Sequence, residues 1–328
     1  MFASVALAVL LALIGFKIFS VLTCIWCRCN VCLSGKTAII TGGNSGIGYQ
    51  IATSLASRGC RIIIADKMDG TEAKNKMIAE THNPNIEYKY MDLASFKSVR
   101  EFAADIIAKE ERLDILINNA GIAATNMVLT EDDLQRTMQV NYFGPFLLTC
   151  LLTELLKKSA PSRIIFVASL ASIIANLTTD NLNPNSDYIR KGKINNEIYA
   201  NSKLGDILIS MGFAKRLKGT GVTSNVFCPG GVNSQIYNSA KDDQGFRISV
   251  YALALLSWFY GKSPQAGAQT AIHLACSNEL ENVTGKFFKE CFPIPVLHPK
   301  VYNQKYCDEI WTETERLVKL KESEKISV

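Results

Sequence analysis

Short β-branched runs alternate with helical segments along most of the chain, and this alternation constrains the fold more than any other feature. Apolar runs with strand character are expected at 36–40, 61–65, 87–91, 113–118, 163–168 and 222–228. Helical segments are expected at 47–55, 95–109, 131–157 and 197–217. Strands that alternate with helices favour a parallel sheet with helices on both faces. The sequence therefore predicts a single α/β domain with a doubly wound parallel sheet, whose ligands bind outside the carboxyl ends of the strands.

Composition and charge narrow the class of protein. The 328 residues are 48% hydrophobic and 20% charged, which is ordinary for a globular chain that can bury a sizeable core. The net charge is +5 at pH 7, but the basic residues are scattered and form no stripe interleaved with aromatic residues. Nucleic acid is therefore not an expected partner. A mild basic excess suits an anionic membrane surface better.

The first 23 residues are nearly all apolar and contain one charge, Lys17. A helix of about 22 residues reaches about 33 Å, enough to cross a hydrocarbon layer of about 30 Å. An uncleaved membrane anchor helix is favoured over a monotopic hairpin, a surface helix or a signal peptide, because no basic stretch precedes the segment and no clear cleavage site ends it. Arg28 and Lys36 follow the segment, so the rest of the chain is expected in the cytosol.

These features divide the chain into four expected parts. They are an anchor at 1–23, a Cys-rich juxtamembrane linker at 24–35, the folded domain at 36–322 and a tail at 323–328. The expected location is the endoplasmic reticulum membrane, with the lipid droplet surface as an alternative.

Two stretches interrupt the alternation of expected strands and helices. The polar segment 178–196 is expected to be a loop that could shape a substrate entrance, and the apolar segment 249–260 is either a buried helix or a lid that touches membrane and lipid.

Four of the ten cysteines crowd into the linker, namely Cys24, Cys27, Cys29 and Cys32. Zinc sites usually separate two cysteine pairs by a dozen or more residues, whereas these two Cys-x-x-Cys halves nearly touch, so no metal is expected. Juxtamembrane cysteines are candidates for reversible palmitoylation, and reduced thiols without a role are the favoured alternative. The other six are widely spaced and are expected to be reduced thiols, several of them in the core: Cys60, Cys150, Cys228, Cys276, Cys291 and Cys307.

A glycine-rich turn follows the first expected strand and opens the first expected helix. Glycine there allows the backbone to approach a pyrophosphate closely while the helix N-terminus faces the negative charge. Asp66 ends the second strand, 20 residues after Gly46, where a carboxylate accepts hydrogen bonds from the adenosine ribose and repels a 2′-phosphate. The pattern predicts a Rossmann-like dinucleotide site. Its turn residues are Gly42, Gly43, Asn44, Ser45, Gly46, Ile47 and Gly48.

Tyr199 and Lys203 are four residues apart on an expected helix, so they share a face. A free tyrosine titrates near about 10, and a fixed cation close by favours the phenolate. A Tyr-x-x-x-Lys pair often arises by chance, but two other residues give it weight. Ser169 stands just after a strand, where its hydroxyl could bond a substrate oxygen. Asn141 lies inside an expected helix, a poor position for asparagine unless its side chain has a task.

Taken in order, these motifs resemble those of the short-chain dehydrogenase/reductase superfamily. They are the glycine turn 41–48, Asn118 to Gly121, Asn141, Ser169, the Tyr199/Lys203 pair and Pro229-Gly230. The chain is more closely similar to the microsomal retinol dehydrogenases of the retinal-reductase branch. That likeness covers nearly the whole chain, including the apolar N-terminus and the segments 199–204, 214–217, 267–270 and 285–288.

The resemblance implies a role for each matching residue. Tyr199 would be the general acid/base, Lys203 would favour its phenolate and hold the nicotinamide ribose, and Ser169 would bind the reacting oxygen. Asn141 would hold a water in a proton relay. Other positions are implied to line the cofactor: Asp92, Leu93, Asn119, Ala120, Gly121, Pro229, Gly230 and Val232. The superfamily often forms dimers or tetramers, so a homo-oligomer is compatible with the resemblance.

One departure concerns the cofactor. The retinal-reductase branch typically carries a basic residue after the second strand and prefers NADPH, whereas Asp66 stands here, followed by Lys67. The carboxylate favours NAD(H), and Lys67 keeps NADP(H) open.

The sequence thus predicts a membrane-anchored oxidoreductase that interconverts an apolar alcohol and its aldehyde or ketone with NAD(P). The substrate would be a retinoid, isoprenoid, sterol or fatty aldehyde. The alternatives are an NADPH-dependent retinal or carbonyl reductase and a non-catalytic, cofactor-binding membrane scaffold. A hydrolase is poorly supported, because the three histidines stand in no recognisable nucleophile-and-base arrangement: His82, His273 and His298.

Overall fold

The computed structural model describes residues 15, 24–123, 128–184, 195–233 and 261–326. The expected anchor at 1–23 lies outside these ranges except for residue 15, and the apolar segment 249–260 lies outside them entirely. Within the described ranges, no helix is both long enough and apolar enough to cross a membrane.

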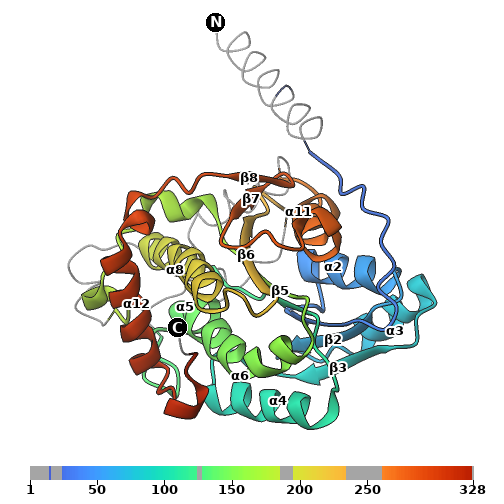
Figure 1. The fold of residues 1–328 in the computed structure, drawn as a ribbon, viewed down its shortest axis with the longest axis horizontal. Helices are drawn as coiled ribbons and strands as arrows, with labels where there is room; N and C mark the ends of the chain where they lie inside the picture. The colour runs from blue at the N-terminus through green and yellow to red at the C-terminus, as the bar shows by residue number, and fades with distance from the viewer. Residues whose placement is uncertain (1–14, 16–23, 124–127, 185–194, 234–260, 327–328) are drawn as a thin grey trace, which may run out of the picture.

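One sheet forms the centre of the domain, with strand order β3-β2-β1-β4-β5-β6-β7-β8 (Figure 1). The first seven strands in this order are parallel, and β8 pairs with β7 in the antiparallel direction. The chain reverses its direction of travel across the sheet between β1 and β4, which is where open α/β sheets bind ligands. The strands are β1 Thr37–Thr41, β2 Arg61–Asp66, β3 Ile86–Tyr90, β4 Ile115–Asn118, β5 Ser162–Val167, β6 Val222–Cys228, β7 Phe287–Lys289 and β8 Phe292–Ile294.

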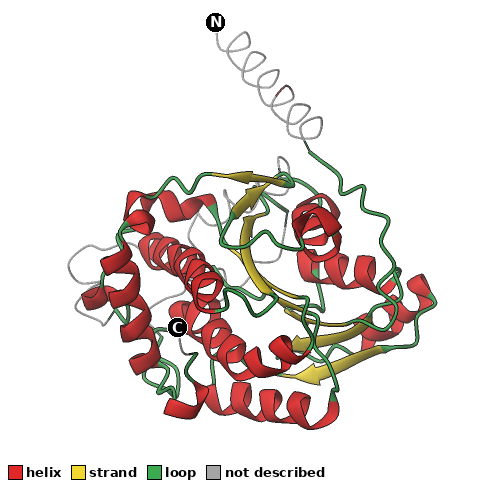
Figure 2. Ribbon diagram, viewed as in Figure 1, coloured by secondary structure: helices red, strands yellow, loops and turns green. Residues whose placement is uncertain are grey.

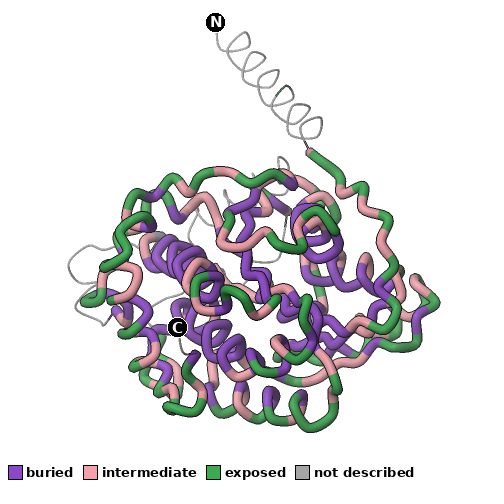
Figure 3. The backbone as a smooth tube through the Cα atoms, viewed as in Figure 1, coloured by how far each residue is buried: buried purple, intermediate pink, exposed green. Residues whose placement is uncertain are grey.

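Helices cover both faces of the sheet (Figure 2), and the two faces bury separate apolar clusters. In β1, Ile39 faces the cluster beneath α4, α6 and α8, whereas Ile40 faces the cluster beneath α2 and α11. The buried backbone follows the sheet and the inner sides of these helices (Figure 3). The described helices include α2 Gly46–Ala56, α3 Thr71–Thr81, α4 Phe96–Lys109, α5 Arg136–Met138, α6 Gly144–Lys158, α8 Asn195–Arg216, α11 Pro264–Cys276 and α12 Gln304–Leu317.

The elements follow the expected alternation, with one helix shortened and several added. The helix expected from residue 131 begins at Arg136, because Asp133 has a positive φ of 60° and Leu129 forms a bridge with Gln135. The expectations did not include α3, α11, α12, β7 or β8. The last described residues pack on the domain: Glu324 forms an ion pair with Arg100, and Ile326 is buried.

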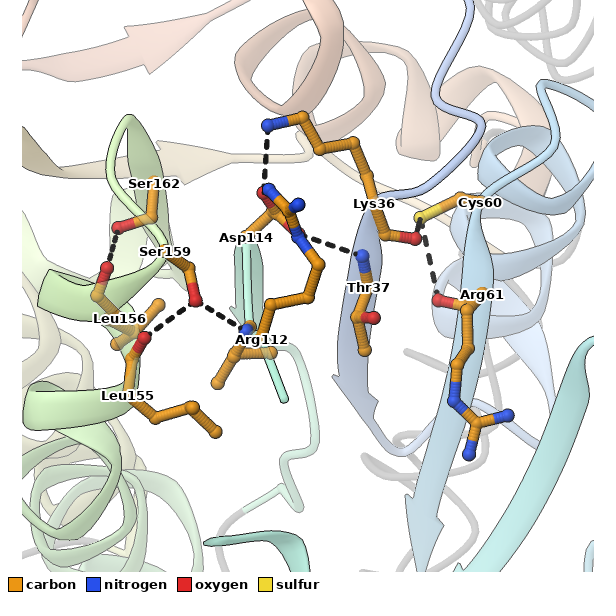
Figure 4. A network of polar contacts seen from close by, with 11 residues as sticks. Lys36, Thr37, Cys60, Arg61, Arg112, Asp114, Leu155, Leu156, Ser159 and Ser162 are labelled. Atoms are coloured by element: carbon orange, nitrogen blue, oxygen red, sulfur yellow. Dashed lines mark hydrogen bonds and ion pairs between the residues drawn. The ribbon is translucent and has the colours of Figure 1, made fainter. Parts of the chain in front are cut away.

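A polar network holds the strands together at their amino ends (Figure 4). The Asp114 carboxylate accepts hydrogen bonds from the Lys36 Nζ at 2.9 Å, from the Thr37 backbone at 2.9 Å and from the Arg112 guanidinium at 2.6 Å. Burial alone would raise the pKa of Asp114, but these donors outweigh burial and hold it below its ordinary value. Ser159 joins the same edge by accepting from the Leu113 backbone at 2.8 Å. The carboxyl ends, at the opposite edge, carry the predicted site.

Candidate active site

The glycine turn between β1 and α2 has the backbone shape that a dinucleotide requires. Gly42 and Gly46 have positive φ angles of 66° and 58°, which glycine adopts without strain. A Cβ on Gly48 would lie 2.2 Å from the Gly42 carbonyl oxygen, so the helix approaches the strand closely only because residue 48 is glycine. A Cβ on Gly46 would meet no atom within 4 Å, so the turn is open on that side.

Polar groups at this turn are left for a ligand. The Ser45 side chain makes no capping hydrogen bond to α2, which leaves amides of the first helical turn available to an anion. The Asn44 Oδ1 is buried without a hydrogen-bond partner among the described residues, while its Nδ2 donates to the Met68 carbonyl at 2.7 Å. An orphaned acceptor and unclaimed amides beside an open glycine turn fit a dinucleotide phosphate and its ribose.

Asp66 lies at the edge of this turn. Its carboxylate accepts a hydrogen bond from the Met68 backbone at 3.1 Å and also interacts with the backbone of Asn44 and Lys67. Burial raises the pKa of Asp66, and these backbone donors oppose the shift. Lys67 is exposed. The carboxylate therefore stands beside the glycine turn, while the lysine points to solvent.

Asp92 and Leu93 follow β3 and lie further along the same edge of the sheet. Asp92 Oδ1 accepts from the Ala94 backbone at 2.8 Å, which fixes the turn after the strand. Leu93 is buried, and a Cβ on Gly144 would lie 2.9 Å from its carbonyl oxygen. The start of α6 thus packs tightly on this turn because residue 144 is glycine.

Asn119 ties β1 to β4 at the point where the strand order reverses. Its Nδ2 donates to the Thr41 carbonyl at 2.9 Å and to the Gly42 carbonyl at 3.3 Å. In return, the Thr41 hydroxyl accepts from the Asn119 and Ala120 backbone amides, each at 2.9 Å. Asn119 therefore supports the glycine turn from the neighbouring strand.

Lys203 is the centre of the polar cluster on α8. The residue is 4% exposed, and its Nζ donates to the Val167 carbonyl at 2.8 Å and to the Asp206 carboxylate at 2.9 Å. The same Nζ lies 6.0 Å from the centre of the Tyr199 ring. A Cβ on Gly121 would lie 3.7 Å from it. The structure thus brings the predicted Tyr199/Lys203 pair next to the ends of β4 and β5.

The positive charge of Lys203 is balanced by Asp206, one turn later on α8. Burial opposes the charged form of Lys203, but the negative charges of Asp206 and Tyr199 outweigh that cost and raise the lysine pKa. Burial raises the pKa of Asp206 to about 7, and Lys203 opposes this shift. The pair therefore keeps a cation in place beside Tyr199 over the neutral pH range.

Asn141 lies in a π-helical turn, Gln139–Phe143, between α5 and α6. Pro145 has no amide hydrogen to donate to the Asn141 carbonyl four residues earlier, and the Gly144 amide bonds instead to the Gln139 carbonyl five residues back. The Asn141 side chain accepts from the Ile122 backbone at 2.8 Å and donates to the Ile122 carbonyl at 3.0 Å. It also donates to the Ser202 hydroxyl at 3.1 Å, which connects it to α8.

Ser169 follows β5, two residues after the carbonyl that holds Lys203. It begins a short 3-10 helix, Leu170–Ile174, and its Oγ accepts from the Ala171 backbone at 3.1 Å. Because one acceptor position is used in this cap, the hydroxyl proton remains available for a second bond. A second bond of this kind would leave the cap intact.

Pro229, Gly230 and Val232 follow β6 at the same edge of the sheet. Gly230 has a positive φ of 79°, and its amide donates to the Cys228 Sγ at 3.4 Å. Val232 is buried and pairs with Lys262, and a Cβ on Gly267 would lie 2.7 Å from it. This segment packs on α11, whose Gly267 also lies near Ile47 of α2.

The predicted residues thus form two connected groups. The glycine turn, Asp66 and Asn119 form the first, and Tyr199, Lys203 and Asn141 form the second with Ser169 at the adjacent strand end. Asp206 and Ser202, which hold Lys203 and Asn141, are not among the residues predicted from the sequence. An aspartate inside an otherwise apolar stretch, three residues after the lysine, was the available signal for Asp206.

Comparison with known proteins gives a consistent result. A family model described as short chain dehydrogenase matches residues 36–179. Retinol dehydrogenase 13 of Mus musculus is 40% identical over 305 residues, covering 90% of this chain and 87% of that protein. Retinol dehydrogenase 12 of Homo sapiens is 38% identical over 287 residues, covering 87% of each chain. Among solved structures, the Pseudomonas aeruginosa RhlG/NADP active-site complex has a TM-score of 0.60 at 26% identity, covering 78% of this chain and 95% of that one.

Proposed function

This chain belongs to the short-chain dehydrogenase family, and from that premise we propose that it interconverts an apolar alcohol and its aldehyde or ketone at the Tyr199/Lys203 cluster. The observation that carries the proposal is the position of the Lys203 Nζ. It is buried, bonded to the Val167 carbonyl and to Asp206, and 6.0 Å from the Tyr199 ring. A lysine held this firmly next to a tyrosine suits a proton-transfer site better than a surface contact.

The glycine turn and the residues around it supply the cofactor site. A bound nicotinamide dinucleotide supplies a hydride for carbonyl reduction or accepts one in alcohol oxidation. The first turn of α2 and Asn44 would hold its phosphates and ribose, and Asn119 keeps the turn in shape. We infer that NAD(H) is preferred, because the Asp66 carboxylate stands beside the turn and repels a 2′-phosphate.

Proton transfer is assigned to this chain's own side chains. In the reductive direction Tyr199 donates its hydroxyl proton to the substrate oxygen, and in the oxidative direction its phenolate accepts that proton. Lys203 stabilises the phenolate by its charge. The Ser169 hydroxyl binds the reacting oxygen, a bond that strengthens as negative charge develops there. Asn141 and Ser202 connect the base of this cluster to the backbone at Ile122, and we propose that they position a water for reprotonation.

The substrate class and location follow from different observations. The apolar first 23 residues support an anchor in the endoplasmic reticulum membrane with the domain facing the cytosol. A membrane-bound enzyme meets substrates that partition into lipid, such as retinoids, isoprenoids, sterols and fatty aldehydes. The named relatives are retinol dehydrogenases, which supports a retinoid among these.

A second candidate is an NADPH-dependent retinal or carbonyl reductase. Lys67 favours it, because an exposed lysine directly after Asp66 could pair with a 2′-phosphate. Turnover of a panel of apolar alcohols and aldehydes, each with NAD(H) and NADP(H), tests both candidates. Activity that depends on Tyr199 supports the proposal, and no turnover on any member with either cofactor argues for the non-catalytic scaffold.

A further inference from the structure

Two thiols of the linker and one imidazole of α11 lie together on the outer side of that helix. The Cys29 Sγ lies 3.5 Å from the His273 Nδ1, although the two residues are 244 positions apart. The Cys27 Sγ completes the group, and the three ligand atoms all lie within 4.8 Å of one another. The spacing of the four linker cysteines disfavours a metal site built from them alone, but His273 lies far from them in sequence and adds a ligand that this spacing does not include.

The separation of these atoms matches a tetrahedral zinc site. With Zn–S bonds of about 2.3 Å and Zn–N bonds of about 2.0–2.1 Å, tetrahedral geometry separates sulfur from nitrogen by about 3.5 Å and sulfur from sulfur by about 3.8 Å. The distance of 3.5 Å between the Cys29 Sγ and the His273 Nδ1 already equals the sulfur–nitrogen separation of a tetrahedral site. The two sulfur atoms lie at most 4.8 Å apart, so a side-chain movement of at most about 1 Å brings them to the sulfur–sulfur separation of about 3.8 Å.

The backbone around the three residues is fixed independently of any ion. The Cys27 amide donates to the Gln269 Oε1 at 3.0 Å, one helical turn before His273. The Arg58 guanidinium donates to the Cys29 carbonyl at 3.3 Å. Both cysteines pack against the apolar cluster beneath α2 and α11. Because residues two apart in an extended segment point to the same side, this anchoring directs both thiols at His273.

The donor chemistry selects the ion. Two sulfur ligands and one imidazole favour Zn²⁺ over the hard cations Mg²⁺ and Ca²⁺, which take oxygen ligands.

We propose that Cys27, Cys29 and His273 form a Zn²⁺ site that fastens the linker 24–35 to helix α11. The site is separate from the Tyr199/Lys203 cluster and does not depend on the proposed function. Its effect is mechanical. It fixes the path of the chain between the apolar N-terminal segment and the domain, and so limits how the domain can turn relative to that segment.

The test measures zinc in the full chain, purified in detergent after loading with Zn²⁺ and removal of excess ion. Elemental analysis should find about one zinc per chain in the wild type and close to none in Cys27→Ser, Cys29→Ser or His273→Gln. Cys32→Ser is the matched control, because Cys32 lies in the same linker, is exposed and bonds to its near neighbour Ser34. It should keep its zinc. Cobalt in place of zinc should give thiolate charge-transfer absorption in the wild type and Cys32→Ser alone.

Trypsin supplies a readout that needs neither turnover nor a spectrum. Arg28 lies between the two cysteines and is exposed, so cleavage after it reports how firmly the linker is held. A chelator should speed this cleavage in the wild type but not in Cys27→Ser, which should be cleaved rapidly with or without it. A wild type that retains no zinc, or zinc retained equally by Cys27→Ser and Cys29→Ser, would overturn the proposal. Unchanged thermal melting of the variants shows that loss of zinc is not loss of fold.

Discussion

Lys203 and Asp206 form a buried ion pair within one turn of α8, with the lysine Nζ 2.9 Å from the aspartate Oδ2. The side chains are 5% and 3% exposed, so water screens neither charge. The aspartate offsets the cost of burying the ammonium group, and it also weakens the positive field that reaches Tyr199. It is a positioning residue, because it acts on the reaction through Lys203.

Replacing Asp206 with asparagine should move the pH profile of alcohol oxidation. The amide oxygen can still accept from Lys203, but the negative charge that raises the lysine pKa is gone. The acidic limb should move to lower pH by about one unit, because the phenolate now faces an uncompensated cation. The alkaline limb should move the same way as the lysine pKa falls. Profiles of kcat/KM between pH 5 and 10 measure this, and an unshifted profile would contradict the positioning role.

Tyr199→Phe should lower turnover by at least about 10²-fold, the usual scale for a positioned acid or base. Cofactor binding should change little, because the hydroxyl serves mainly the reacting oxygen. Tyr302→Phe is the matched control, since Tyr302 is exposed and its hydroxyl donates to the nearby Val296 carbonyl. Steady-state rates with any accepted alcohol or aldehyde decide the matter. Near-normal turnover in Tyr199→Phe would refute the assignment of Tyr199 as the acid or base of the reaction.

Asp66→Ala should relax the preference for NADH over NADPH, because the carboxylate beside the glycine turn no longer repels a 2′-phosphate. Lys67→Ala should act in the opposite direction and weaken NADPH alone. Fluorescence titration of the wild type and both variants with each reduced cofactor gives the six dissociation constants needed. If the wild type binds NADPH ten-fold more tightly than NADH, a difference of about 1.4 kcal/mol, the electrostatic argument is wrong.

Asp114→Asn should destabilise the fold by about 1–3 kcal/mol at neutral pH and spare the active site, which lies at the opposite edge of the sheet. The folded-state pKa of Asp114 is lowered, so its contribution is present above the ordinary aspartate value and lost as pH falls through the folded value. The difference in Tm between variant and wild type should therefore shrink below about pH 4. Asp308→Asn, at an exposed pair with Lys215, should leave Tm unchanged. A constant Tm difference from pH 7 to pH 3 would refute the assignment.

Two glycosylation sequons test the orientation in the membrane. Asn176-Leu177-Thr178 and Asn282-Val283-Thr284 should both stay unmodified if the domain faces the cytosol. Both acceptor asparagines are exposed, but Leu177 inside the first sequon is fully buried, so Asn282 is the more informative. A sequon in an extension placed before Met1 serves as the positive control, since the amino end would face the lumen. A glycosidase-sensitive mass shift at Asn282 would reverse the proposed topology.

The sheet was predictable because its strands are short apolar runs between turns. The run 61–65 became β2 Arg61–Asp66, and 222–228 became β6 without a change of bounds. The missed helix α3 buries only Met77, so its sequence carries almost no apolar period. The helix start predicted at residue 131 was too early for a different reason. Asp133 adopts a left-handed conformation that its neighbours stabilise, and local propensity does not reveal this.

The parts of the candidate site that belong to a sequence motif could be predicted. The parts that depend on contacts between distant segments could not. The glycine turn could be placed from order along the chain, since it joins a strand to a helix. The bonds that hold Lys203 to the Val167 carbonyl, and Cys29 to His273, join segments that are distant in sequence. Spacing within one segment contains no information about such partners.

The π-helical turn at Gln139–Phe143 lies within one continuous helix that serves two purposes. It packs α6 into the core, and it holds the Asn141 side chain at Ile122 and Ser202. The Gly144 amide bonds to the Gln139 carbonyl five residues back, so this wider turn takes up one extra residue inside the helix. Deleting one residue there would restore the regular bond to the residue four positions back. The buried face of α6 would stay where it is, while the Asn141 amide would leave Ile122 and Ser202. The number of residues in this one turn therefore lets α6 pack in the hydrophobic core while the Asn141 side chain stays in the proposed proton path.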